Sequence, residues 1–114
     1  MAYDEDVTGR FRDMLGGMVG VTEKRMMGGV CFMVNGNMVG GAHREKTGDR
    51  QFMFRVGKDN MQQALTAPHA RPVQMGSRAP MQGFVFVDAD AIDEEVLRSW
   101  LSLALSHVSA LPPK

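Results

Sequence analysis

The dipeptide Asn35-Gly36 constrains the fold more than any other feature, because it separates two short apolar runs. Residues 30–34 precede it and residues 37–39 follow it, both rich in Val and Met. The central residues of a two-residue hairpin turn need positive φ, which Asn and Gly adopt readily. The spacing therefore predicts a hairpin, with Met33 paired to Met38 and Phe32 paired to Val39.

Other periodic patterns predict the rest of the secondary structure. The Gly40-Gly41 pair predicts a bulge or a close backbone approach in the returning strand. Apolar and aromatic runs predict strands at residues 51–56, 70–75 and 83–88, whereas residues 22–27 are short and extended and 43–50 form a charged loop tip. Helical spacing predicts helices at residues 7–18 and 59–67, and a last helix capped by Asp90 with an apolar stripe over 96–108.

This order of elements predicts an α+β fold. In the order α-β-β-β-α-β-β-α, strands that follow one another in the chain can pair with each other. This is typical of a two-layer sandwich with helices on an antiparallel five-stranded sheet. No internal repeat or linker interrupts the chain, so we expect one domain over residues 1–114. A length of 114 residues is ordinary for a single domain.

Composition bears on the compartment and excludes several classes of protein. Hydrophobic residues are 44% and charged residues 23%, typical of a globular domain and not of a disordered or fibrous chain. The single Cys31 cannot form an internal disulfide, and the acidic start is no signal peptide, so we expect a cytoplasmic protein. The uncharged stretch 26–43 is broken by glycines and Asn35-Gly36, which argues against a membrane span.

The charges argue against independent nucleic-acid binding. Thirteen Lys and Arg balance 13 Asp and Glu, whereas proteins that neutralise many phosphates are strongly basic. The two ends are acidic, and residues 60–87 hold no acid. This basic middle is either ordinary solvated surface or a modest patch that faces an anion.

No catalytic or metal-binding motif is present. Cys31 lies in an apolar run and is expected to be a buried core thiol rather than a nucleophile. His43, His69 and His107 share no ligand spacing with one another or with Cys31, so we expect no metal and no cofactor. The 11 methionines either fill the core or form a soft contact surface for a partner or a second copy.

Three arginines are the best candidates for a binding site. Arg55 lies inside an apolar strand, and Arg25 and Arg71 lie in extended segments. On one sheet face, three guanidiniums would hold a carboxylate or phosphate by bidentate pairing. The alternative is that each reaches water or pairs with a nearby acid: Glu23, Asp59 or Asp88.

Several segments, in order along nearly the whole chain, resemble the TfoX N-terminal domain family (the TfoX/Sxy group). The most specific are Lys24-Arg25-Met26-Met27-Gly28-Gly29 and Asn35-Gly36-Asn37. The other matching segments are Arg55-Val56-Gly57, Pro68-His69-Ala70-Arg71-Pro72, residues 83–88 and the closing Trp100-Leu101 helix.

The resemblance implies a two-layer fold like that of secretion chaperones and supplies no catalytic residues. Full-length members look like positive regulators of natural competence that assist a cyclic-AMP-dependent activator. They carry a C-terminal helical domain, and this chain ends at Pro112-Pro113-Lys114 without one. Met27 and a long 43–50 loop depart from the family pattern.

Three functions follow as hypotheses. The first is a non-enzymatic protein-interaction module, linked to transcription and competence, whose partner is a transcription activator or RNA polymerase. A homodimer is an open alternative. Its contact surface would be the basic sheet edge around Arg25, Arg55, His69 and Arg71. The second is a sensor of a small anionic ligand, bound by the same arginines and the Gly28-Gly29 backbone. The third is an enzyme that uses Cys31 or His69.

Overall fold

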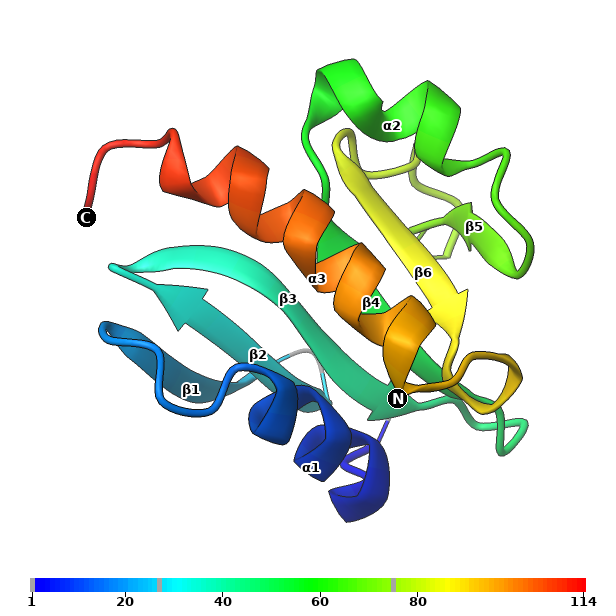
Figure 1. Cartoon of the computed structure of the whole chain (residues 1–114). Coiled ribbons are helices and arrows are strands. Elements are labelled where there is room, and N and C mark those ends of the chain that lie inside the picture. The colour runs from blue at the N-terminus through cyan, green and yellow to red at the C-terminus, as the bar shows by residue number, and fades with distance from the viewer. Residues whose placement is uncertain (1, 27, 75) are drawn as a thin grey trace.

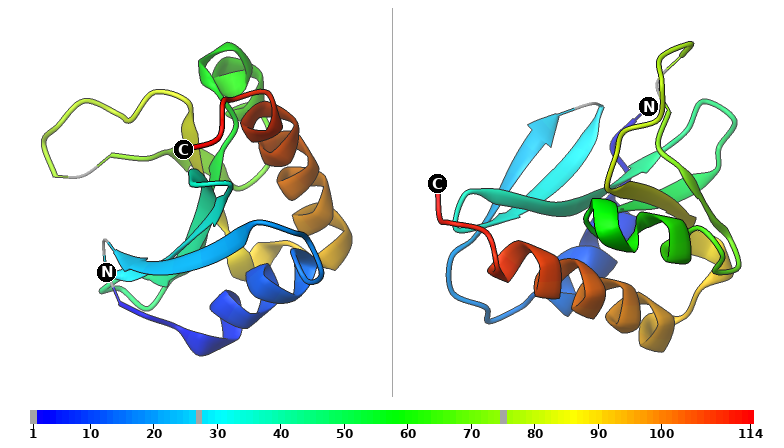
Figure 2. Two further views of the ribbon diagram at one scale, coloured as in Figure 1. Left: turned by 90° about the vertical axis from the view of Figure 1, so that its left-hand side faces the viewer. Right: turned by 90° about the horizontal axis from the view of Figure 1, so that it is seen from above.

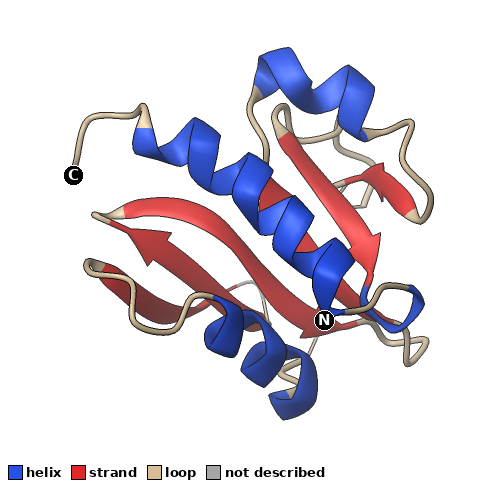
Figure 3. Ribbon diagram, in the orientation of Figure 1, coloured by secondary structure: helices blue, strands red, loops and turns tan. Residues whose placement is uncertain are grey.

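The fold is a six-stranded antiparallel sheet with its helices on one face (Figures 1 and 3). The computed structural model describes residues 2–26, 28–74 and 76–114. Within these residues the strand order is β1-β2-β3-β4-β6-β5. The strands are β1 (Val21–Met26), β2 (Gly29–Val34), β3 (Asn37–Arg44), β4 (Arg50–Arg55), β5 (Ala70–Pro72) and β6 (Phe84–Asp88). The helices are α1 (Glu5–Met14), α2 (Lys58–Ala64) and α3 (Glu94–Ser109), with a short 3-10 turn, η1 (Ala89–Ala91).

The predicted α+β class is confirmed, but the sheet has one strand more than the five predicted. The extra strand is β1, which occupies the segment predicted only as extended. Its middle residues are all exposed, so no apolar alternation marks it, and backbone pairing with β2 holds it in place. The segment predicted as extended ends at Met27, and the strand predicted at 70–75 ends at Met75. Both of these residues lie outside the described ones. Pro72 ends β5 at the sheet edge.

The β2–β3 hairpin forms at Asn35-Gly36, as predicted. Asn35 has φ 52° and Gly36 has φ 83°, and Met33 pairs with Met38. The predicted pairing of Phe32 with Val39 is wrong, because a bulge shifts the register and Phe32 pairs with Gly40. The displaced Val39 is fully buried in the core.

Gly40 allows β3 and β4 to approach closely, as the glycine pair predicts. A Cβ atom there would lie 2.0 Å from the Met53 carbonyl oxygen and 3.1 Å from Cζ of Phe11. Phe11, from α1, stacks on Phe32 with ring centroids 4.6 Å apart and also packs against Phe52 and Phe54. This aromatic group is the centre of the core between helices and sheet.

The helix ends differ in part from prediction. Asp4 caps α1 by accepting from the Val7 N–H, and the helix ends at Met14, short of the predicted Met18, because Gly16-Gly17 follow. Asp93 caps α3 by accepting from the Val96 N–H at 2.9 Å, so the predicted cap at Asp90 is wrong.

The charged segment predicted as a loop tip at 43–50 is largely sheet. His43 and Arg44 belong to β3 and Arg50 to β4, so only residues 45–49 form the turn. Pairing continues to Arg44 and Arg50, and the backbone of Ala2 bonds to Arg44 on its free side. His43 is therefore buried, with 5% of its surface exposed.

Candidate functional site

The sheet face turned away from the helices carries a second apolar cluster, which we call the open face. Alternate strand residues point to this side, opposite those that meet α1 and α3. Its buried members are Cys31, Met53, Val73 and Phe86, and its half-buried members are Met26, Met33, Met38, Met81 and Phe84. Burial raises the pKa of the Cys31 thiol, as predicted for a core cysteine, so it is not an activated nucleophile.

Described parts of the connection between β5 and β6, residues 73–74 and 76–83, lie over the open face, and the β3–β4 turn borders it through Glu45. Figure 2 (left) shows the β5–β6 connection on the side of the sheet opposite the helices. It is anchored by the fully buried Val73, whose carbonyl accepts from the Met81 N–H at 2.8 Å. The methionines of β1, β2 and β3 lie towards the opposite edge of the sheet from β5 and Val73, and they are half-buried.

A polar group surrounds Phe86 where β3, β4, β6 and β5 lie side by side. The His43 ring packs against Phe86 with centroids 5.0 Å apart, and the Arg71 guanidinium lies 4.7 Å from the Phe86 centroid. Glu45 Oε1 joins them, at 3.1 Å from His43 Nε2 and 3.2 Å from Arg71 Nη2. Because a carboxylate only accepts hydrogen bonds, Nε2 of the neutral His43 ring carries the proton.

Burial and these contacts set the charges of the group. Desolvation lowers the pKa of His43, although Glu45 opposes the shift, so the ring is neutral at pH 7. Burial alone would raise the pKa of the Glu45 carboxyl, but the hydrogen bonds from His43 and Arg71 hold it below its usual value. The group therefore carries one negative and one positive charge, which largely cancel.

Gln51 lines a hollow beside this group. Its side chain is 5% exposed, and its Oε1 atom has no hydrogen-bond partner. The hollow has a volume of about 590 Å³, and its other lining residues include Lys46, Asp49 and Phe86. Charges of both signs line it, which suits a mixed polar surface of a protein better than a single anion.

The structure does not bring the three predicted arginines together. Arg55 and Arg71 project to the open face, where Arg55 lies 5.9 Å from the Phe84 ring centroid. Arg25 belongs to β1 at the opposite edge from β5, faces the helix side and lies 4.1 Å from the Tyr3 ring centroid. A cradle of three guanidiniums on one face is therefore not assembled.

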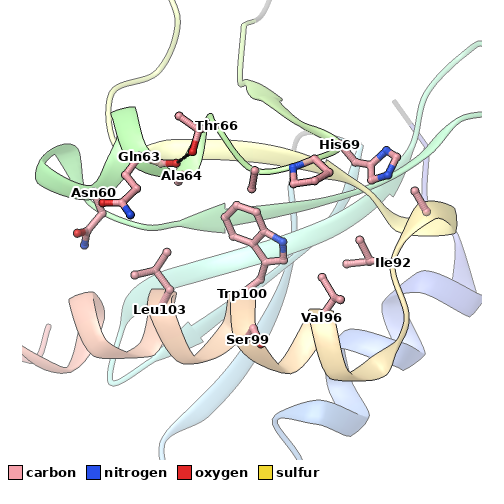
Figure 4. Close-up of a pocket in the computed structure, with 13 residues that line it drawn as sticks. Asn60, Gln63, Ala64, Thr66, His69, Ile92, Val96, Ser99, Trp100 and Leu103 are labelled. Atoms are coloured by element: carbon pink, nitrogen blue, oxygen red, sulfur yellow. Dashed lines mark hydrogen bonds between the residues drawn. The ribbon is translucent and has the colours of Figure 1, made fainter.

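The other predicted site residues lie in three separate places. Gly28 is exposed with φ 77°, immediately before β2. Gly29 is buried, and a Cβ there would lie 2.7 Å from His43 Cβ, so it allows β2 to pass His43 closely. His69 has φ 67° and lines a hollow on the helix side, between α2 and α3 (Figure 4).

Sequence reasoning missed the polar group around Phe86. The sequence pattern places His43 and Glu45 in a loop and does not distinguish Gln51 from its neighbours. The signal was the alternation of the third predicted strand, since Gln51 lies two residues before Met53 and on the same face. Extending the returning hairpin strand forwards from Val39, in pairing with residues 51–56, would have placed His43 opposite Gln51, as it is found.

Two properties of the described residues bear on the class of protein. None of their helices combines the length and apolarity needed to cross a bilayer. In residues 2–26, 28–74 and 76–114, no three His, Cys, Asp or Glu side chains gather in a way that could hold a metal ion.

Comparison with known proteins identifies the family. No curated protein and no solved structure matches the chain. A family model described as the TfoX N-terminal domain matches residues 13–108. That range begins in α1, includes every strand and ends one residue before the end of α3. The chain belongs to the TfoX N-terminal domain family.

Proposed function

We propose that this domain is a non-enzymatic protein-interaction module, a TfoX-like regulator associated with competence, which contacts its partner through the open face. The observation that carries the proposal is the apolar, methionine-lined sheet face that no described helix covers. Methionine gives soft, adaptable contacts, and apolar surface framed by charged residues is typical of protein interfaces.

Two arginines give this surface its specificity. Arg55 is half-buried beside Phe84, and Arg71 is exposed beside Phe86, so each guanidinium borders apolar contact area. Arginine and aromatic side chains are enriched at the energetically important positions of interfaces. The partner we propose is a transcription activator or RNA polymerase that offers a carboxylate to these arginines. Membership of the family supports a regulator of this kind.

Binding of the tagged domain to the purified cyclic-AMP-dependent activator and to RNA polymerase of the source organism tests the proposal. The double variant Arg55→Glu/Arg71→Glu should bind at least about tenfold more weakly than wild type, because two attractive charges become repulsive. The matched control is Arg98→Glu, an exposed position on α3 on the other side of the molecule. Thermal melting of each variant ensures that the comparison is between folded proteins.

The outcomes separate the possible surfaces. Loss of binding in Arg98→Glu but not in the double variant would move the interface to the helix side. If the wild-type domain binds neither the activator nor RNA polymerase, the proposed partner is wrong. Light scattering in the same series reports self-association, and a dimer that the double variant loses would assign the open face to a second copy instead.

A further inference from the structure

A hollow of about 690 Å³ separates α2 from α3 on the helix side of the sheet (Figure 4). This volume lies within the range of small-molecule sites, roughly 300–1,000 Å³. The α3 wall is mainly apolar, with Val96, Trp100 and Leu103 beside the hydroxyl of Ser99, and Ile92 lines the hollow before the helix. The opposite wall is formed by α2 and the turn that follows it, up to His69.

Trp100 gives this hollow an unused hydrogen-bond donor. The side chain is only 7% exposed, and its ring stacks on Phe54 of the core with centroids 5.4 Å apart. Figure 4 shows the indole nitrogen on the side of the ring towards His69 and Ile92, with no hydrogen bond drawn to it. Among the described residues no side chain or backbone group accepts from this N–H, and the atom is not fully buried, so an acceptor bound in the hollow can reach it.

The lining excludes charged ligands. None of its residues is Asp, Glu, Lys or Arg. An ionised ligand would lose its hydration in the hollow without gaining a counter-charge, which is strongly unfavourable. The polar lining residues are instead neutral amide and hydroxyl side chains such as Gln63 and Ser99, together with the ring of His69.

His69 is held at the rim of the hollow by its backbone. Its φ of 67° is uncommon for a residue other than glycine, and its carbonyl accepts from the Asp88 N–H at 3.2 Å. Pro68, which also lines the hollow, restricts the chain immediately before it. The turn therefore fixes the main chain of His69 at the rim of the hollow.

From these observations we propose that the α2–α3 hollow is a binding site for a small, uncharged aromatic compound whose acceptor atom takes the Trp100 indole N–H. Apolar walls favour the ring system, the unpaired donor selects a ring nitrogen or carbonyl, and the absence of charge rejects acids. This site lies on the opposite side of the sheet from the open face, so the proposal does not depend on the proposed partner contact.

Three probes of similar size test this assignment: quinoline, naphthalene and 2-naphthoate. Quinoline is uncharged near pH 7.5 and has a ring-nitrogen acceptor, naphthalene has the same shape without it, and 2-naphthoate adds a charge. Trp100 is the only tryptophan in the chain, so its indole N–H gives a single signal in ¹H–¹⁵N spectra. Quinoline should move that signal downfield in a saturable way, together with the amides of Val96 and Leu103.

The other probes and three variants define the result. Naphthalene should bind at least about fivefold more weakly and leave the indole signal nearly in place, and 2-naphthoate should not bind. The Trp100→Phe variant has no indole signal, so its binding is followed through the backbone amides. It should bind quinoline no more tightly than it binds naphthalene. Val96→Phe fills the hollow and should weaken quinoline binding about tenfold, whereas Ser102→Phe, an exposed position on the same helix, should not.

Any of three outcomes would overturn the proposal. The first is no saturable change at the pocket residues with millimolar quinoline. The second is equal binding of quinoline and 2-naphthoate, which would contradict the selection against charge. The third is a set of shifted amides confined to the open face, which would place the probe at the other surface of the domain.

Discussion

Trp100 lies with its ring plane within 10° of that of Phe54, at a centroid distance of 5.4 Å. This stacked pair joins α3 to β4, and through Phe54 it reaches Phe11 on α1. Because Trp100 also lines the α2–α3 hollow, one side chain contributes to both the core and the proposed binding site.

Trp100→Ala is expected to destabilise the domain by about 3–5 kcal/mol, because it removes a large buried side chain and leaves a cavity against Phe54. Trp100→Phe keeps part of the stacking and should cost clearly less. Chemical denaturation gives the free energy of unfolding for each variant. Val19→Ala, at a side chain that is 91% exposed, should change that free energy by less than about 0.5 kcal/mol. Equal losses of unfolding free energy in all three variants would contradict a stabilising role of the Trp100–Phe54 stack.

Arg10 ties α1 to the segment that leads into α3. Its guanidinium donates to the carbonyls of Ala89 and Ile92, at 2.8 and 2.9 Å, and to Glu94. Arg10→Ala leaves those carbonyls unpaired and should cost about 1.5–3 kcal/mol of unfolding free energy.

The matched control for Arg10 is Arg12→Ala on the same helix. Arg12 pairs with Glu23 and Glu5 at the surface and is 43% exposed, so its loss should cost less than about 1 kcal/mol. The loss of unfolding free energy in Arg12→Ala should become smaller when the salt concentration is raised, because salt screens exposed ion pairs. The loss in Arg10→Ala should change less. A larger loss in Arg12→Ala than in Arg10→Ala would be the contrary result.

Gly40→Ala should destabilise the domain by about 1–3 kcal/mol, because the new Cβ would overlap the Met53 carbonyl. Gly9→Ala is the control, since a Cβ at Gly9, within α1, meets no atom within 4 Å. Alanine is the better helix former, so that variant should gain about 0.5–1 kcal/mol. Thermal melting distinguishes the two, and a neutral Gly40→Ala would show that β3 and β4 can separate without cost.

His43 makes the stability of the domain depend on pH. Its pKa in the folded chain is lowered from the usual 6.5, chiefly by desolvation, so the unfolded chain binds the proton more readily. The stability from the neutral ring is therefore complete above about pH 6.5 and declines as the pH falls towards the folded pKa. Unfolding free energies at pH 7.5 and 5.5 should differ more for wild type than for His43→Gln. A difference of equal size in both proteins would assign the pH dependence to other groups.

The sequence predicted elements well where one side of the element is buried. Residues 51–56 alternate between core and open face, and α3 carries a clear apolar stripe, so both were found. β1 was missed as a strand because its middle residues, Thr22–Arg25, are all exposed and its backbone pairing leaves no apolar pattern. The α2–α3 hollow was equally invisible, because it depends on how two helices pack and not on any local motif.

The site residues show the same limit at a finer level. Which face a strand residue points to depends on register, and a single position changes it. Arg25 pairs with Val30 and so faces the helices, whereas Arg71 pairs with Phe86 and faces away. Asp90 precedes an acidic first turn, and for that reason the sequence predicts it as the helix cap. Asp93, three residues further on, has that role, and Asp90 instead accepts from Arg50.

The two edge strands of the sheet, β1 and β5, are poor templates for aggregation. On β1 the exposed side chains include Glu23, Lys24 and Arg25, and β5 is three residues long and ends at Pro72, which has no N–H. A strand from another molecule would displace water from charged groups at one edge and would find a donor missing at the other. The domain is thereby protected against the strand-by-strand addition that builds insoluble fibres, even though both of its edges are open.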